Sequence, residues 1–368
     1  MRKKRIAIIG ANSSIALLIK KAKALGYETH VFAWACGDPG EKEADFFYPI
    51  SISEKETILE KCREIGICGV CSITSDFAAP IVAFIARNLG LPGNPEKTDI
   101  VARNKYEMRK AFKKTGSIYC PEFAEADEKF NVELVKEFHF PVIVKPTDRW
   151  SSKGITRVDS VENLNKAVEI AVGESINKKA IIEEYVDGPE YSAECIVWNG
   201  NLEVLAFTKK MTTGYPHYIE NGHIQPSDIP LEKQGSIKDV IKTAVNALGI
   251  TNSAAHAEFR IMKNGDICFM EIGARMGGDC IGTDLTPIST GVDYLRMVID
   301  VSCGNKPCFD LVSKPRKVMV KFIMNESDYH EFETINSETI IRSEIYDLEF
   351  DREVVDSSTR HGFYIVGL

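Results

Sequence analysis

An Asn-Gly dipeptide at positions 264 and 265 lies between two mainly apolar runs, and it constrains the fold more than any other feature. Asn-Gly favours a two-residue type I′ turn, because both residues tolerate a positive φ. Residues 254–273 are therefore predicted to form a β-hairpin in a fixed register. That register places Glu258 directly opposite Glu271.

Strand alternation divides the side chains of this hairpin between two faces. One face carries only apolar residues, with Ile261 opposite Cys268: Ala257, Phe259, Ile261, Cys268, Met270 and Ile272. The other face is mostly polar and carries His256, Glu258, Arg260, Phe269 and Glu271.

The opposed carboxylates of Glu258 and Glu271 need an explanation. Opposite residues have Cβ atoms about 5 Å apart, and two unit charges at that distance repel by roughly 3 kcal/mol at an effective dielectric near 20. In open solvent the repulsion falls to about 1 kcal/mol, so an exposed pair without a ligand is one interpretation. A divalent cation held between the carboxylates is the other.

Length and charge indicate a globular protein with several domains. A chain of 368 residues exceeds one typical core and predicts two or three domains. The net charge is −8 with Lys and Arg scattered, which argues against a nucleic-acid surface. No apolar run approaches the length of a membrane span. The basic start leads into a predicted strand at residues 5–9 and is not interpreted as an export signal.

Ten cysteines are spread along the chain without a compact framework. Cys68 and Cys71 form a CxxC motif, but residues three apart on a strand point to opposite faces. A metal or redox role for that motif is therefore disfavoured. Free thiols and a cytoplasmic location are expected.

Residues 1–95 alternate predicted strands and helices, which indicates a small parallel sheet covered by helices. The turn at residues 10–14, Gly-Ala-Asn-Ser-Ser, lacks the second and third glycines of GxGxxG. We therefore expect a tight strand-to-helix turn with some ligand contact, and not a dinucleotide site. Asp76 is predicted to be the N-cap of the helix that follows it.

The central region contains further strands, a helix and a second hairpin. Residues 209–229 are rich in Gly, Pro and His and are predicted to be a long polar loop, either a substrate-recognition loop or a disordered one. The predicted strands are 142–145, 155–158, 180–185, 191–198 and 202–208, the last two joined across Asn199-Gly200, with a helix at 231–248. The end of the chain predicts strands at 318–323, 339–344 and 362–366.

Two segments could contact a nucleotide. Lys145 ends a buried apolar strand and precedes the loop 147–154, where backbone amides and the hydroxyls of Ser151 and Ser152 could wrap phosphate oxygens. Alone, such a lysine usually only extends to water. Residues 183–186 end a strand and could offer backbone groups to a heterocycle, or could be an acidic surface edge.

Taken in order, these motifs resemble the ATP-grasp superfamily, and within it the carboxylate–amine ligases. The resemblance covers essentially the whole chain. It implies an α/β fold, α+β in the ATP-grasp part: a Rossmann-like domain at 1–95, an ATP-grasp domain at 96–312 with a mobile lid at about 117–186, and a β-rich C-terminal subdomain at 313–368. The motifs are Asn104-Lys105 to Arg109, Val144-Lys145-Pro146, Ser151 to Gly154, Glu183 to Val186, the hairpin, and Glu271 to Gly278.

The resemblance also implies roles for individual residues. Those expected to bind ATP are Lys105, Lys145, Ser151, Ser152, Gly154, Glu183, Glu184, Val186, Glu190 and Phe269, although Phe269 could equally be a core aromatic. Those expected to act in catalysis are Arg275 and Lys145, and those expected to hold Mg²⁺ are Glu258 and Glu271. Those considered for substrate contact are Lys209, His223, His256, Gly277 and Gly278, with a structural role as the alternative for His256.

One position departs from the family pattern. Many members carry Asn two residues after the second metal ligand, where this chain has Gly273. The resemblance therefore implies one bound magnesium ion. It leaves open whether a second ion binds and whether Mn²⁺ can replace Mg²⁺.

The implied function is an ATP-dependent ligase that joins a carboxylate, of an amino acid by expectation, to an amine through an acyl phosphate. Two alternatives stay open: an enzyme of the same superfamily that phosphorylates a small acid or closes a ring, and a non-catalytic nucleotide-binding module. The expected partners are small molecules and neither nucleic acid nor membrane, with a homodimer left open.

Overall fold

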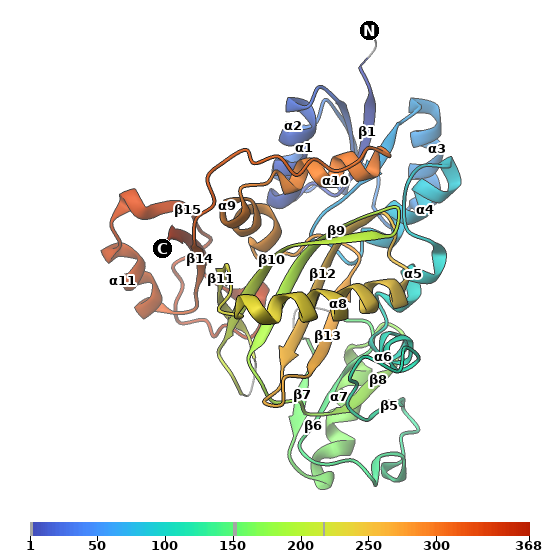
Figure 1. Cartoon of the computed structure of the whole chain (residues 1–368), viewed down its shortest axis with the longest axis vertical. Coiled ribbons are helices and arrows are strands. Elements are labelled where there is room, and N and C mark those ends of the chain that lie inside the picture. Colours follow the sequence, from blue (N-terminus) through green and yellow to red (C-terminus); the bar gives the residue numbers. More distant parts are fainter. Residues whose placement is uncertain (1–2, 150–152, 216–217) are drawn as a thin grey trace.

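The structure is a computed structural model that describes residues 3–149, 153–215 and 218–368. In Figure 1 the N-terminal sheet lies at the top, a small sheet at the bottom, and a large sheet between them that continues to the left. The α/β fold class predicted from the sequence is confirmed.

The N-terminal region is a parallel four-stranded sheet in the order β3-β2-β1-β4. Alternating strands and helices build it, as the sequence predicts, and apolar side chains fill the core on both faces. The strands are β1 (Arg5–Ile9), β2 (Glu28–Phe32), β3 (Phe46–Tyr48) and β4 (Gly69–Cys71), and the helices are α1 (Ser13–Ala24), α2 (Pro39–Glu43), α3 (Lys55–Ile65) and α4 (Ala79–Leu89).

The small sheet at the bottom of Figure 1 is antiparallel, in the order β5-β8-β6-β7. The apolar face of helix α7 covers it, and helices α5 and α6 connect it to the N-terminal sheet. The elements are α5 (Glu96–Val101), α6 (Lys105–Lys113), β5 (Phe123–Ala126), β6 (Val142–Pro146), β7 (Thr156–Val158), α7 (Leu164–Glu174) and β8 (Ala180–Glu184).

The large sheet has eight strands in the order β13-β12-β9-β10-β11-β14-β16-β15. The three C-terminal strands therefore continue this sheet. Helix α8 packs its apolar side on one face, and α10 joins the sheet to the N-terminal core. The elements are β9 (Glu190–Trp198), β10 (Asn201–Thr212), β11 (Glu220–Gln225), α8 (Leu231–Leu248), β12 (Ser253–Ile261), β13 (Ile267–Gly273), α9 (Thr286–Thr290), α10 (Tyr294–Ser302), β14 (Val318–Ile323), α11 (Glu326–Thr334), β15 (Ile340–Ile345) and β16 (Gly362–Gly367).

The hairpin β12–β13 forms, but its turn differs from the prediction. The N–H of Met262 donates to Asp266 and the N–H of Gly265 donates back to Met262, which closes a three-residue loop. Gly265 has a positive φ of 91° and Asn264 does not have one. The Asn264 side chain accepts from the N–H of Asp266 at 3.0 Å, an Asx-type contact that competes with the type I′ turn.

The register therefore changes along the hairpin. Near the turn, Ile261 faces Ile267 and not Cys268. A β-bulge between the Glu258 and Phe259 pairs then adds one residue to β13 and restores the predicted pairing of Glu258 with Glu271. The predicted opposition of the two glutamates is correct, although two local features that cancel produce it.

Between the turn and the bulge the shifted register places Cys268 opposite Arg260 and Phe269 opposite Phe259, so the faces predicted for these two side chains are wrong. Phe269 is 1% exposed and packs against Phe112 and Phe259, with ring centroids 5.4 and 6.1 Å away. Met270 takes the position beside the polar face and lines the pocket described below. Phe269 is therefore a core residue and not the floor of a ligand site.

The long polar loop predicted at 209–229 is also wrong. Strand β10 continues to Thr212, and β11 pairs with it through Lys209↔Ile224 and Lys210↔His223. β11 also pairs with β14, so it lies inside the sheet. Polar residues on one side of these strands face a pocket, and this removed the hydrophobic alternation that normally reveals a strand.

Candidate active site

A pocket of about 1090 Å³ lies between the small sheet, α6 and the large sheet. Strand ends and strand faces from distant parts of the sequence meet there, as expected of a ligand site between two layers. Its lining residues are Lys105, Pro121, Ile143, Lys145, Arg149, Ile155, Glu183, Glu184, Tyr185, Val186, Glu190, Tyr218, Glu220, Glu258, Arg260, Met270, Glu271 and Arg275.

One wall of the pocket carries the Glu183 cluster, which we define as Arg109, Lys145 and Glu183. Arg109 Nε donates to Glu183 Oε2 at 3.0 Å, and Lys145 Nζ donates to Glu183 Oε1. Burial alone would raise the pKa of Glu183, but the charges of Arg109 and Lys145 lower it to about 2. Burial lowers the pKa of Lys145.

This geometry gives Glu183 a different role from the one considered. Its carboxylate is held by two cations, and the residue as a whole is 4% exposed. The partnership with Arg109 was missed, because the sequence spacing of 74 residues carries no signal for it. Two cations around one carboxylate leave positive charge facing the pocket.

Lys105 lies at the start of α6, where Asn104 caps the helix by accepting from the N–H groups of residues 106 and 107. Its Nζ lies 3.1 Å from Glu271 Oε2 and donates to the Arg149 carbonyl at 2.6 Å. The Lys105 N–H also donates to the Thr147 carbonyl at 2.8 Å. The start of the 147–154 loop is therefore attached to α6 beside the pocket.

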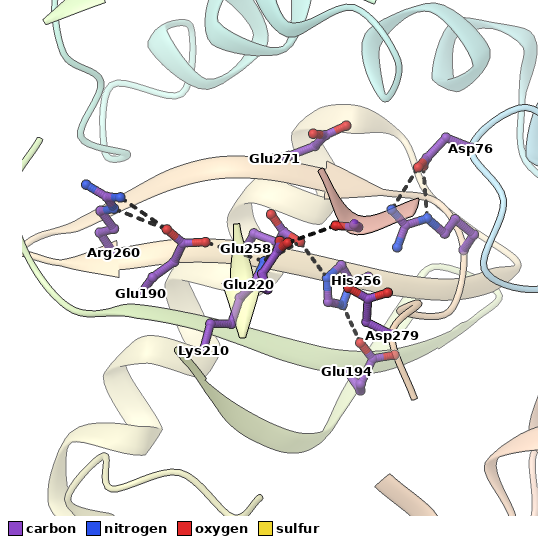
Figure 2. A network of polar contacts seen from close by, with 12 residues as sticks. Asp76, Glu190, Glu194, Lys210, Glu220, His256, Glu258, Arg260, Glu271 and Asp279 are labelled. Atoms are coloured by element: carbon purple, nitrogen blue, oxygen red, sulfur yellow. Dashed lines mark hydrogen bonds and ion pairs between the residues drawn. The ribbon is translucent and has the colours of Figure 1, made fainter. Parts of the chain in front are cut away.

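The opposite wall carries the Lys210 cluster, which we define as Lys210, Glu190, Glu220 and Glu258 (Figure 2). Lys210 Nζ lies 2.8 Å from Glu258 Oε1, 3.3 Å from Glu220 Oε1 and 3.4 Å from Glu190 Oε1. Burial opposes the charge of this ammonium, but the three carboxylates raise the pKa of Lys210 well above its usual value.

The lysine predicted to contact substrate was the neighbouring Lys209. Successive side chains on a strand point to opposite faces, and Lys209 points out of the pocket to Asp228, with Nζ to Oδ2 at 2.5 Å. Lys209 was placed in a loop, where alternation gives no information about direction. Once residues 209–212 are known to be strand, the choice between the two lysines follows.

His256 connects the Lys210 cluster to a second buried carboxylate. Its Nδ1 bonds to Glu194 on β9, and its Nε2 lies 3.0 Å from Glu258 Oε1. Burial would lower the pKa of His256, but the charge and hydrogen bond of Glu194 raise it to about 9. His256 therefore links Glu194 to Glu258 and positions the Glu258 carboxylate (Figure 2).

Gly277 packs against this pair. Its N–H donates to Glu194 Oε2 at 3.0 Å, and a Cβ there would lie 2.3 Å from Glu194 Oε1 and 2.7 Å from His256 Nδ1. A Cβ at Gly278 would meet nothing within 4 Å. The absence of a side chain is required at Gly277 for packing, and neither glycine lines the pocket.

Arg275 binds a residue of the N-terminal region. Its Nε and Nη2 donate to the two carboxylate oxygens of Asp76 at 2.9 and 2.8 Å. The predicted N-cap role of Asp76 is wrong, because α4 begins later, at Ala79. Gly273 lies against this pair, since a Cβ there would be 2.9 Å from Asp76 Oδ1. An Asn at this position would collide with the ion pair.

The far end of the pocket is formed by residues 184–190 and Arg260. Arg260 Nη1 donates to the Val186 carbonyl at 2.8 Å, and its Nη2 donates to Glu190 Oε2 at 3.2 Å. Glu184 Oε1 accepts from the N–H of His139 at 2.8 Å. Arg260 thus fixes both the backbone at Val186 and the carboxylate of Glu190.

Two further candidates, His223 and Gly154, are not among the residues that line the pocket. His223 is fully buried with its ring against Phe322, and among the described residues neither ring nitrogen has a hydrogen-bond partner. Burial lowers the pKa of His223 to about 3. Gly154 has a φ of 70°, and a Cβ there would lie 3.0 Å from Pro146 and 3.1 Å from Glu174. Ser151 and Ser152 lie outside the described residues.

Glu258 and Glu271 are the residues that could hold a divalent cation. Carboxylate oxygens suit Mg²⁺, which is usually bound by one or two carboxylates together with substrate phosphates. Within the described part of the chain no group of three or more His, Cys, Asp or Glu side chains could hold a metal alone. The donor set therefore fits an ion that phosphate oxygens help to bind, and does not fit a self-sufficient metal site.

Residues 138–284 match the ATP-grasp domain family. With the two antiparallel sheets around one charged pocket, this match identifies residues 138–284 as an ATP-grasp domain. The described residues contain no helix long and apolar enough to cross a membrane.

Similar proteins include amino-acid ligases. The chain is 29% identical over 300 residues to alanine–anticapsin ligase of Bacillus subtilis, covering 72% of this chain and 62% of that protein. It is 30% identical over 151 residues to D-alanine–D-alanine ligase of Flavobacterium psychrophilum, covering 39% and 45%. The crystal structure of an L-amino acid ligase from Bacillus licheniformis has the same fold, with a TM-score of 0.83, 24% identity and coverage of 100% and 94%. The chain thus spans 62% of the length of the first relative.

Proposed function

We propose that this protein is an ATP-dependent ligase that joins the carboxylate of an amino acid to an amine and releases ADP and phosphate. The observation that carries the proposal is that Lys105, Lys145 and Arg275 line one pocket with the opposed carboxylates of Glu258 and Glu271. The names of the similar ligases support amino acids as the substrate class.

The proposed binding mode follows the charges of the pocket. Lys105 and Lys145 bind phosphate oxygens of ATP, in line with the excess of cations around Glu183. The backbone of residues 184–186 faces the adenine, and Glu190, held by Arg260, accepts ribose hydroxyls. Tyr218 and Glu220 bring the β10–β11 hairpin into the pocket, which supports a role of that hairpin in substrate recognition.

The proposed reaction has two steps. The substrate carboxylate attacks the γ-phosphorus of ATP, the bond to the bridging oxygen breaks, and an acyl phosphate and ADP form. The amine then attacks the acyl carbon and phosphate leaves. Such transfers depend on positioning and charge neutralisation, which Lys105, Lys145 and Arg275 supply.

Glu258 and Glu271 would hold Mg²⁺, which, when bound, neutralises phosphate charge and orients the γ-phosphate. Gly273 offers no side chain as a further ligand, and the Asp76–Arg275 pair fills the space beside it. We therefore propose one magnesium ion with both carboxylates and leave the remaining ligands to phosphate and water. We also propose that the ATP-grasp domain begins near residue 95 and ends near residue 312.

Incubation with magnesium-ATP, pooled amino acids and amines tests the function. We expect ADP, phosphate and a product whose mass equals that of the two substrates minus water. An acyl phosphate or a cyclised product in place of an amide would favour the alternative reactions within the superfamily, and tight ATP binding without turnover would favour a binding module.

Glu258→Gln tests the site itself. The amide keeps the shape of the side chain and removes the charge, so ADP formation should fall by about 10²–10³, as expected for a lost transition-state contact. Asp266→Asn is the matched control, because Asp266 lies on the same hairpin and its carboxylate bonds to Asn264 outside the pocket. Unchanged ADP formation by Glu258→Gln would contradict the proposed metal site.

A further inference from the structure

Two thiols from distant parts of the sequence meet beside the N-terminal sheet. Cys68 directly precedes β4, and Cys303 follows the last residue of α10. Their Sγ atoms are 4.0 Å apart, at a sequence separation of 235. Both side chains are partly exposed. In the sequence Cys68 shares a CxxC motif with Cys71, whereas in the structure it contacts Cys303.

The approach of the two segments depends on Gly69. A Cβ at this position would lie 2.6 Å from Cys303 Sγ and 2.8 Å from the Ser302 carbonyl. Any other residue after Cys68 would therefore push the end of α10 away. The sulfur atoms are already in van der Waals contact, and a disulfide of about 2.05 Å needs them to move about 2 Å closer.

The two thiols differ in reactivity. A hydrogen bond joins the two thiols, and with the charge of Lys4 it lowers the pKa of Cys68 to about 7. The same hydrogen bond, together with burial, raises the pKa of Cys303. Because the thiolate is the nucleophile, Cys68 is the first to react and Cys303 stays protonated.

We propose that Cys68 and Cys303 are a reversible thiol–disulfide pair that a peroxide oxidises. The Cys68 sulfur attacks one peroxide oxygen, the O–O bond breaks, hydroxide leaves, and Cys68 becomes a sulfenic acid. The Cys303 sulfur then attacks that sulfur, the S–O bond breaks, and water leaves with the Cys303 proton. Two electrons pass from the thiols to the peroxide. A dithiol reductant then restores both thiols by thiol–disulfide exchange and is itself oxidised to a disulfide.

The disulfide would connect two parts of the molecule that form one cleft. Cys71 and Ser302, close neighbours of the pair in the sequence, line a cleft of about 520 Å³ between β4, α4 and α10, and Arg275 lies in the same lining. Oxidation therefore ties the N-terminal sheet to α10 at the wall of that cleft. This inference does not depend on the proposed reaction.

The test uses the full-length reduced protein with a small excess of hydrogen peroxide, followed by blocking with N-ethylmaleimide and digestion without reductant. We expect mass spectrometry to find a peptide pair joined through Cys68 and Cys303, with two of the ten thiols lost. Dithiothreitol should return both thiols. Failure to find this pair while other cysteines are oxidised would overturn the proposal.

Single variants test the order of the steps. Cys303→Ser should stop at a sulfenic acid on Cys68, trapped by dimedone, and Cys68→Ser should leave Cys303 unmodified at the same peroxide dose. Cys36→Ser, which removes an exposed thiol elsewhere, should form the disulfide as the wild type does. Modification of Cys303 in Cys68→Ser at the wild-type rate would overturn the assigned roles. The wild-type peptide map stands independently of how well the variants fold.

Discussion

The two walls of the pocket are built from the same residue types in opposite proportions. In the Glu183 cluster one fully buried carboxylate is shared by two cations, Arg109 and Lys145. In the Lys210 cluster one buried ammonium is shared by three partly exposed carboxylates. The first wall therefore offers positive charge to an anion, and the second offers negative charge to a cation. A phosphate chain with its bound metal ion has the complementary arrangement.

The largest expected effect is a loss of stability when the Glu183 cluster is changed. Glu183→Gln keeps the shape of the side chain but leaves two buried cations without a counter-charge, which should lower the free energy of unfolding by about 3–5 kcal/mol. Urea denaturation measures it. Glu184→Gln is the control, because its carboxylate bonds to an exposed histidine, and it should change stability by less than about 1 kcal/mol. If Glu183→Gln and Glu184→Gln lowered the free energy of unfolding equally, Glu183 would not be the counter-charge on which this wall depends.

The second largest expected effect is a difference between the two walls in how their contribution to stability depends on pH. The pKa of Glu183 is lowered from 4.5 to about 2, so its contribution is present above pH 4.5 and is lost as the pH falls through 2. The pKa of His256 is raised from 6.5 to about 9, so its contribution is present below pH 6.5 and is lost as the pH rises through 9. Each shift corresponds to about 3 kcal/mol.

Unfolding free energies measured against pH, with a chelator present, test this separation. The difference between the wild type and Glu183→Gln should shrink in acid, and the difference between the wild type and His256→Gln should shrink in alkali. If both differences were flat with pH, the two groups would not carry the charges assigned to them.

Lys210→Met tests the second wall directly. The variant keeps the length of the side chain and leaves three carboxylates facing one another, which should cost about 2–3 kcal/mol of stability. Added Mg²⁺ should then raise the Tm of this variant more than that of the wild type, because the competing ammonium is gone. Lys209→Met, on the other face of β10, should stay within about 0.5 kcal/mol of the wild type. A larger effect of Mg²⁺ on the wild type would contradict the view that Lys210 competes for the carboxylates.

The two Asn-Gly turns show how far sequence reasoning extends. At Asn199-Gly200 both residues have positive φ, 51° and 76°, and the predicted two-residue turn forms. At Asn264-Gly265 the same dipeptide forms a three-residue loop, because the Asn264 side chain binds the backbone of Asp266. The dipeptide alone does not distinguish the two outcomes. The pairing of Glu258 with Glu271 was predicted correctly only because the later bulge restores the register.

The same limit explains the candidates that were misplaced. Side-chain direction was predictable wherever the strand was recognised, as for Glu258, and failed where a polar strand resembled a loop, as for Lys210. Partners far apart in sequence, such as Asp76 with Arg275 or Glu194 with His256, depend on the tertiary fold and left no local pattern. The order of the motifs, in contrast, predicted the α/β fold and named several of the residues that line the pocket, among them Lys105, Lys145, Glu190, Glu258, Glu271 and Arg275.

The smallest expected effect is the loss of stability in Gly277→Ala, beside the Glu194–His256 pair. Gly277→Ala places a Cβ 2.3 Å from Glu194 Oε1 and 2.7 Å from His256 Nδ1, so the Glu194–His256 pair must shift. Overpacking of this kind should cost roughly 1–2 kcal/mol. It should also weaken the alkaline loss of stability, because His256 loses part of its contact with Glu194. Gly278→Ala meets nothing within 4 Å and is the matched control. Urea denaturation at pH 7 and pH 9 measures both variants, and a Gly277→Ala curve that parallels the wild type at both values would show that Glu194 does not set the charge of His256.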